Sequence, residues 1–360
     1  MHLKKKAKTV EKITAIISIL VMFGFVATFF IIREKDNKQD INGTRSKRNL
    51  KTLSQSKEFD IPDIQNTDVL GDTCNCMTPQ GICVAGDYIL ITAYCSVDYY
   101  KENLITNINE EANMAKMIDE VHHERHNSVM YVMSEKTKRH VTTLVFDDKS
   151  HVGGITFDGE YVWVAKGGNR KVEAYRYEDI KNLVRRYEES TYLGTPSYEF
   201  ISDSTSSFIA CYDDTVWVGT HNENKDQYGV LIGYSLDNTN NAGLNDSHRI
   251  IIIPPLANGA AFMEVDDVLY LAVTTSYGRH KDSLLHIYKA DFSDEEVLQF
   301  QEYKVLELPP MAEEICVNGE QMYFLFESGA TTYSTVESYK CNNIVTTVRI
   351  ENIRDIIYKR

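Results

Sequence analysis

A short sequence phrase recurs five times along this chain at nearly equal spacing. Each copy has one or two small or acidic turn residues followed by a run of apolar and aromatic residues, and the copies begin at Gly86, Gly159, Asp213, Asp266 and Gly319. The intervals between these residues are 73, 54, 53 and 53 residues, and removing about 20 inserted residues brings the first onto the common period. A repeat of about 50 residues that joins strand-like segments through a turn is typical of a β-propeller blade. The chain is therefore predicted to be all-β, with a five-bladed β-propeller over residues 57–360.

Four strands are expected in each blade, the innermost before the phrase and the second beginning within it. The third strands are expected at residues 128–133, 172–177, 230–236, 284–291 and 344–350, and the outer strands of the first four blades at residues 141–146, 198–201, 249–253 and 303–308. The fifth repeat lacks an outer strand, whereas residues 58–64 form an unassigned strand-like segment. We expect residues 58–64 to complete the fifth blade and close the ring, because closure removes exposed sheet edges.

An apolar segment without a charged residue spans residues 13–32. At 1.5 Å per residue, 20 helical residues cover about 30 Å, the hydrocarbon thickness of a bilayer. The segment is longer than a usual signal-peptide core and no small-residue cleavage site follows it, although a cleaved signal peptide is the alternative. We expect a cytoplasmic tail over residues 1–12, a signal-anchor helix over 13–32, a polar linker over 33–56 and an extracellular propeller on a single-pass cell-membrane protein.

The inserted residues of the first interval, 103–121, have helical periodicity. Apolar residues recur at Leu104, Ile108, Ala112, Ala115, Ile118 and Val121. This pattern predicts an amphipathic helix inserted in the first blade, most simply as a cover over one mouth of the propeller. A helix that binds a partner protein is the alternative.

The net charge of the chain is −14, and the segment 13–32 contributes nothing to it. Because the first 32 residues carry +4, the remainder carries −18. A negative field repels phosphate backbones, so no nucleic-acid partner is expected. The same field favours cationic ligands or divalent ions, although charge of this kind also serves solubility.

Two classes of loop lie on the same face of a propeller, and we call it the upper face. The loops that lead into the innermost strands carry Gln80, His151, Ser206, Asn258 and Glu313. The loops between the second and third strands add Tyr94, His221 and Tyr333. These donors and acceptors on a rigid frame predict a polar site for a small ligand or a surface protein, with ordinary solvated loops as the alternative.

Sequence motifs for catalysis are lacking. The segment from His122 to His126 does not have the His-Glu-x-x-His order of a helical zinc site, so no metal site is predicted there. There is no Gly-x-Ser-x-Gly, no P-loop and no Gly-x-Gly-x-x-Gly. Binding without catalysis and without a cofactor is therefore the leading hypothesis, and whether the protein is an enzyme stays open.

The chain has seven cysteines, and the blade assignment gathers four of them near the seam between the first and last blades. These four are Cys74, Cys76, Cys95 and Cys341. Two disulfides among them would fit an oxidising compartment, and reduced thiols are the alternative. Cys83, Cys211 and Cys316 lie on or beside innermost strands and are expected to be small buried residues, with a Cys83–Cys316 pair left open.

The stretches 78–81 leading to 86–91, and 151–155 leading to 162–164, resemble secreted bacterial propellers of the YncE-like and lactonase-like kinds. Lactonase-like propellers have six blades and hold a catalytic calcium ion through channel-facing Glu, Asn and Asp residues. In this chain there are five repeats, and Asn258 and Glu313 are the only counterparts. The resemblance thus implies a rival function, a calcium-assisted hydrolase that uses Glu313, Asn258 and His151 in the central channel.

Overall fold

The computed structural model describes residues 57–61, 67–97, 124–236, 249–278, 281–293, 295–330, 333 and 348–358. The chain divides into two compact units, Met1–Arg48 and Asn49–Arg360, and every described residue belongs to the second. The expected tail, membrane segment 13–32 and linker 33–56 therefore lie outside the described residues, as does the expected helix 103–121. Within the part that is described, no helix is long and apolar enough to cross a membrane.

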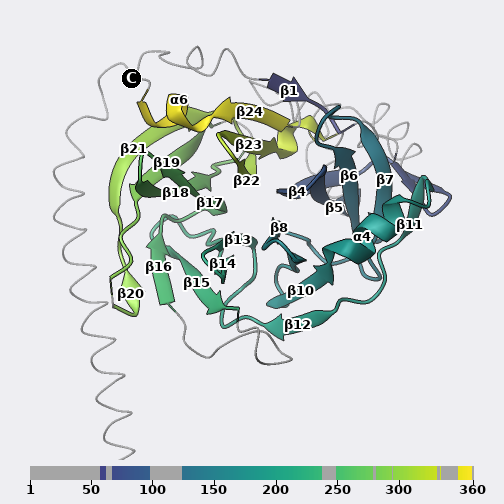
Figure 1. Cartoon of the computed structure of the whole chain (residues 1–360), viewed down its shortest axis with the longest axis horizontal. Coiled ribbons are helices and arrows are strands. Elements are labelled where there is room, and N and C mark those ends of the chain that lie inside the picture. Colours follow the sequence, from purple (N-terminus) through teal and green to yellow (C-terminus); the bar gives the residue numbers. More distant parts are fainter. Residues whose placement is uncertain are drawn as a thin grey trace, which may run out of the picture. The chain divides into compact units, whose positions relative to one another are not determined.

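Five β-sheets lie around a common centre in the described part of the chain, which confirms the five-bladed propeller (Figure 1). From the centre outward, blade 1 consists of β4 (Met77–Ala85), β5 (Tyr88–Cys95), β6 (Val129–Ser134) and β7 (His140–Val145). Blade 2 consists of β8 (Gly154–Phe157), β9 (Tyr161–Ala165), β10 (Lys171–Arg176) and β12 (Tyr198–Ile201). Blade 3 consists of β13 (Phe208–Tyr212), β14 (Thr215–Gly219), β15 (Gly229–Ser235) and β16 (Arg249–Ile253). Blade 4 consists of β17 (Ala257–Val265), β18 (Val268–Thr275), β19 (Ser283–Lys289) and β21 (Gln301–Leu308).

Blade 5 is built from both ends of the propeller. It contains β22 (Ala312–Asn318), β23 (Gln321–Phe326), β24 (Val348–Asn352) and, at its outer edge, β1 (Lys57–Phe59). Strand β1 runs antiparallel to β24, with Lys57 opposite Ile350, and the two lie side by side in Figure 1. The predicted ring closure is confirmed, and β24 overlaps the described part of the expected third strand at 344–350.

The recurring phrase forms the hairpin turn between the first two strands of each blade. In blade 3 the turn residues Asp213 and Asp214 have φ angles of 49° and 52°, and in blade 4 Asp266 and Asp267 have 51° and 61°. Two consecutive residues with positive φ make the turn type whose twist matches that of paired strands. Aspartate and glycine tolerate this conformation, which explains their place at the start of the phrase.

Several elements were not expected from the sequence. Strand β11 (Ser190–Tyr192) adds to the outer edge of blade 1 and β20 (Val297–Leu298) to that of blade 3, both in parallel. Helix α4 (Tyr177–Val184) follows β10 and buries Ile180 and Val184, one helical turn apart. Helix α6 (Ile353–Tyr358) follows β24, and the hairpin of β2 (Thr67–Val69) and β3 (Asp72–Cys74) precedes blade 1.

The core lies between neighbouring blades. One cluster joins Leu90 and Phe146 of blade 1 to Val164 and Tyr175 of blade 2, so both faces of a blade are buried and its strands are apolar on both sides. Full burial of each such side chain contributes about 1.5–3 kcal/mol. Continuous apolar runs such as 89–91 follow from this arrangement.

A buried lysine interrupts this apolar interface. Lys166 is 1 % exposed, and its ammonium lies 3.1 Å from an Asp148 carboxylate oxygen, 3.2 Å from one of Glu173 and 4.4 Å from the centre of the Phe146 ring. Tyr175 donates a hydrogen bond of 2.7 Å to Glu173. The positive charge of Lys166 helps to hold the pKa of Glu173 below its ordinary value in spite of burial.

Candidate functional site: a ring of polar side chains around a central carboxyl group

The carboxyl group of Glu314 connects four blades at the centre of the propeller. Glu314 lies on β22 and is fully buried. One of its oxygens accepts the N–H of Ile82 at 2.9 Å and that of Ile155 at 2.8 Å, and the other accepts the N–H of Ile209 at 3.1 Å. These amides belong to the innermost strands of blades 1, 2 and 3, so one side chain of blade 5 reaches across the axis.

Three glycines make room for this side chain. A Cβ atom at Gly81 would lie 2.9 Å from the Glu314 carboxylate, and one at Gly154 would lie 2.5 Å from it. A Cβ atom at Gly259 would lie 2.5 Å from the Glu314 Cα atom. Contacts under 3.0 Å are not found for real Cβ atoms, so the glycines and the central carboxyl group depend on each other.

Burial raises the pKa of Glu314 well above its ordinary value, and the three amide donors offset this only in part. A neutral carboxylic acid still suits the site. Its carbonyl oxygen has two lone pairs for Ile82 and Ile155, and its hydroxyl oxygen can accept from Ile209.

Beside this centre lies a group of polar side chains to which all five blades contribute, and we call this group the mouth ring. It consists of Gln80, Tyr94, Arg125, His151, His221, Asn258, Glu313 and Glu327. On its acidic side, Asn258 Nδ2 donates to Glu313 at 3.0 Å, and Gln80 Nε2 donates to Glu327. Thr274 donates to the Glu313 backbone carbonyl at 2.7 Å and so fixes that residue on β22.

The two carboxyl groups of the acidic side repel each other. Burial raises the pKa of Glu313 well above its ordinary value, the charge of Glu327 raises it further, and the hydrogen bond from Asn258 lowers it. Glu313 is 8 % exposed. A cation bound between Glu313 and Glu327 would relieve this repulsion.

The opposite side of the mouth ring is aromatic and basic. The rings of Tyr94 and His151 have centroids 4.4 Å apart, and the Arg125 guanidinium lies 5.8 Å from the Tyr94 centroid. His151 is exposed to solvent, although neighbouring protein removes part of its hydration. The resulting loss of hydration, with the charges of Arg125 and His221, lowers the pKa of His151 to about 4. His151 is therefore neutral near pH 7. His221 Nδ1 lies 3.0 Å from the carbonyl oxygen of Ala257, next to Asn258, which links the two sides.

Six of the eight predicted site residues lie in the mouth ring: Gln80, Tyr94, His151, His221, Asn258 and Glu313. Ser206 does not, since it is fully buried and its hydroxyl donates to the carbonyls of Gly167 and Lys171 at 3.1 and 3.0 Å. Tyr333 is buried in the core between blades 1 and 5. Sequence reasoning missed Arg125, Glu327 and Glu314; glycines at corresponding positions of β4 and β8 were the available signal for Glu314.

No disulfide joins any two of the six described cysteines. The Cys74 and Cys95 sulfurs lie 3.6 Å apart, whereas a disulfide bond measures about 2.05 Å. The predicted seam disulfides are thus not supported for Cys74, Cys76 and Cys95, and Cys341 lies outside the described residues. Cys83 is buried, while Cys211 and Cys316 are half-buried.

No known family model matches this sequence, and no curated protein matches it. Similar solved structures include Myxococcus xanthus glutaminyl cyclase, with 8 % identity over 74 % of this chain and 88 % of that chain and a TM-score of 0.39. A nidogen/laminin complex has 11 % identity over 72 % of this chain and 80 % of that chain, with a TM-score of 0.37. Kuenenia stuttgartiensis hydrazine synthase has 10 % identity over 70 % of this chain and 61 % of that chain, with a TM-score of 0.32. The likeness concerns the fold alone.

Proposed function

We propose that this protein is a membrane-anchored, extracellular β-propeller that binds a small polar ligand at the mouth ring without catalysing its conversion. The observation that carries the proposal is the set of polar side chains that all five blades contribute beside a centre crossed by Glu314. A rigid frame that directs a few donors and acceptors to one place is typical of ligand-binding sites.

The charges of the mouth ring define the chemistry of the ligand. Glu313 and Glu327 favour a cationic group on one side, because it would lie beside two carboxyl groups that repel each other. On the other side, Arg125 Nε is buried and has no hydrogen-bond partner among the described residues. A ligand oxygen would supply that partner. The favoured ligand therefore carries both a cationic group and an anionic or hydrogen-bond-accepting group.

A calcium-assisted hydrolase remains the second candidate. The observation in its favour is the acidic side of the mouth ring, where Gln80, Asn258, Glu313 and Glu327 bring four oxygen-bearing side chains together. Calcium takes six to eight oxygen ligands in flexible geometry, and water could complete such a shell. The residues fit calcium in type, and the ion would supply polarisation of a carbonyl group in its substrate.

Calorimetric titration of the full chain distinguishes these functions, with glycine betaine, choline and calcium chloride as probes. Binding of betaine in preference to choline is expected, because only betaine offers Arg125 an anionic acceptor, its carboxylate, whereas choline has a neutral hydroxyl. A quaternary ammonium group has no N–H to donate, so its attraction to Glu313 is electrostatic, about 4 kcal/mol at 4 Å with an effective dielectric constant of 20. Desolvation offsets part of this attraction, so Glu313→Gln should weaken binding about 10- to 100-fold. Glu307→Gln is the matched control, since Glu307 is exposed on the outer strand β21.

Each outcome of the titration decides between the candidates. Calcium binding lost in Glu313→Gln, together with calcium-dependent hydrolysis of a simple lactone, would favour the hydrolase. If none of the probes binds, or if Glu313→Gln binds like the Glu307→Gln control, the mouth ring is not the site.

The proposed membrane anchoring and cellular location of the protein rest on the uncharged segment 13–32 and on the short basic tail before it. We propose that the N-terminus is cytoplasmic and the propeller is outside the cell. Protease added to intact cells should then digest the propeller. Protection until the cells are permeabilised would contradict this orientation.

A further inference from the structure

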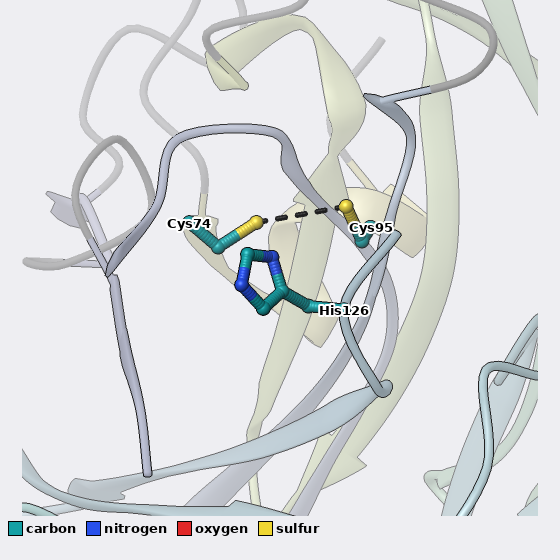
Figure 2. Close-up of side chains that lie close together, drawn as sticks. All are labelled: Cys74, Cys95 and His126. Carbon is teal, nitrogen blue, oxygen red and sulfur yellow. Dashed lines mark hydrogen bonds between the residues drawn. The ribbon is translucent and has the colours of Figure 1, made fainter. Parts of the chain in front are cut away.

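Two cysteines and a histidine lie together outside the mouth ring. Cys74 ends β3, Cys95 ends β5, and His126 precedes β6, so the three side chains come from separate segments of the chain. One ligand atom from each, the two sulfurs and a ring nitrogen, lie within 4.8 Å of one another. Figure 2 shows both sulfurs and the imidazole converging on one point.

The spacing of the sulfurs matches a shared metal ion. With zinc–sulfur bonds of about 2.3 Å and tetrahedral angles, two thiolates on one zinc ion are about 3.8 Å apart. The observed separation is 3.6 Å, far from the bonded distance of about 2.05 Å in a disulfide. Two thiolates and an imidazole are also the soft ligands that zinc prefers in proteins.

The surroundings of His126 suit a metal ligand as well. Its Nε2 atom lies 3.8 Å from a carboxylate oxygen of Asp72, whereas one ring nitrogen faces the sulfurs (Figure 2). A metal-bound histidine is commonly oriented by a carboxylate on its other nitrogen, and Asp72 is placed for that role. The His126 side chain is 12 % exposed, so solvent can approach the group.

We propose that Cys74, Cys95 and His126 bind one zinc ion, which fastens the β2–β3 hairpin to blade 1. The hairpin already contacts this blade, since Thr67 and Tyr131 share a hydrogen bond of 2.8 Å. Three protein ligands leave the fourth position of a tetrahedral zinc ion for water. Bound zinc would keep both sulfurs as thiolates and so prevent a Cys74–Cys95 disulfide.

Zinc binding should depend on pH. Zinc binds thiolates, so each thiol must release its proton on binding. Zinc affinity should therefore fall as the pH is lowered.

Metal analysis of the full chain tests the proposal. The chain is purified under reducing conditions, stripped with a chelator, incubated with excess zinc chloride, desalted and analysed by mass spectrometry for metals. One zinc ion per chain is expected, and none above background in Cys95→Ser and His126→Asn. Cys211→Ser is the matched control and should keep its zinc, because Cys211 is a half-buried cysteine outside the group.

Cobalt substitution of the unmodified chain keeps the test valid if a variant fails to fold. A sulfur-to-cobalt charge-transfer band and the intense visible bands of tetrahedral cobalt are expected, and zinc should abolish both. A zinc content equal in the unmodified chain and the His126→Asn variant would overturn the proposal. So would a Cys74–Cys95 disulfide in peptides of the protein as isolated from cells without reductant.

Discussion

Replacing Glu314 with alanine tests whether the central carboxyl group holds the blades together. The change removes the acceptor of three buried amides, those of Ile82, Ile155 and Ile209. A buried donor left without a partner costs about 1–3 kcal/mol, so the three together cost roughly 3–9 kcal/mol. The free energy of unfolding of an ordinary domain is about 5–15 kcal/mol. Glu314→Ala should therefore lose a large part of the free energy of unfolding.

Glu314→Gln should have an intermediate effect. Its amide oxygen can still accept from two amides, but its NH₂ group then faces the third N–H as a second donor. One unsatisfied amide predicts a loss of about 1–3 kcal/mol. Urea denaturation of the full chain in mild detergent, followed by circular dichroism, gives the order. Stability should fall from the unmodified chain to Glu314→Gln and then to Glu314→Ala.

The pH dependence of stability supplies a second measurement on the same variants. The raised pKa of Glu314 means that the folded state keeps a proton that the unfolded chain releases above pH 4.5. The stability from this group is fully present below that pH and is lost as the pH rises through the folded pKa. Glu314→Gln cannot titrate, so its stability should fall less steeply between about pH 5 and 8. The slope should decrease rather than vanish, because the pKa of Glu313 is raised too.

The matched control is Glu264→Ala, a glutamate that also lies on an innermost strand, β17, but is exposed. Exposed substitutions usually change stability by less than about 0.5 kcal/mol. If Glu314→Ala loses no more than this control, the three hydrogen bonds do not hold the blades together and the reasoning fails.

Three further predictions concern the blades and one concerns the mouth ring. Deleting β1, residues 57–59, should expose the edge of β24 and cause aggregation or a lower melting temperature, measured by light scattering and calorimetry. Gly154→Ala should lower the free energy of unfolding, measured by urea denaturation, by about 1–3 kcal/mol or more, because its Cβ would lie within 3 Å of neighbouring backbone. Lys166→Met should lower the free energy of unfolding by about 1–3 kcal/mol, since it removes one of the two lysines paired with the buried Glu173 carboxylate, and Lys171 remains at 3.0 Å. The His151 resonances in NMR should titrate near pH 4 rather than near 6.5.

Each of these four predictions has a control variant or an outcome that would contradict it. Gly168→Ala should be nearly neutral, because its Cβ would meet nothing within 4 Å, and equal losses at Gly154 and Gly168 would refute the steric argument. A β1 deletion that melts like the full chain would contradict ring closure. A stable Lys166→Met variant would mean that the apolar side chain replaces the ion pair at no cost. Titration of His151 near pH 6.5 would mean that water hydrates the ring far more than its surroundings suggest.

Much of the fold could be predicted from the sequence because its signals are local. The turn residues at Asp213 and Asp266 adopt the positive φ angles that a hairpin requires, and the apolar run after each turn forms the next strand. Equal spacing of these local units determines the number of blades. Ring closure was predictable for the same reason, since a missing outer strand and a spare strand-like segment near residue 58 can only be matched in one way.

The tertiary structure alone decided which polar side chains meet. Glu313 and Glu314 are neighbours on β22, so the residues of this strand alone do not tell which glutamate lies in the mouth ring and which crosses the axis. The same holds for Tyr94 and His151, which come from different blades and stack only once those blades pack. Cys74 and Cys95 were two of the four predicted disulfide candidates, whose pairing the sequence left open, but their sulfurs lie 3.6 Å apart beside His126. Turn and strand preferences act over a few residues, whereas these contacts depend on the packing angle between segments that are distant in the chain.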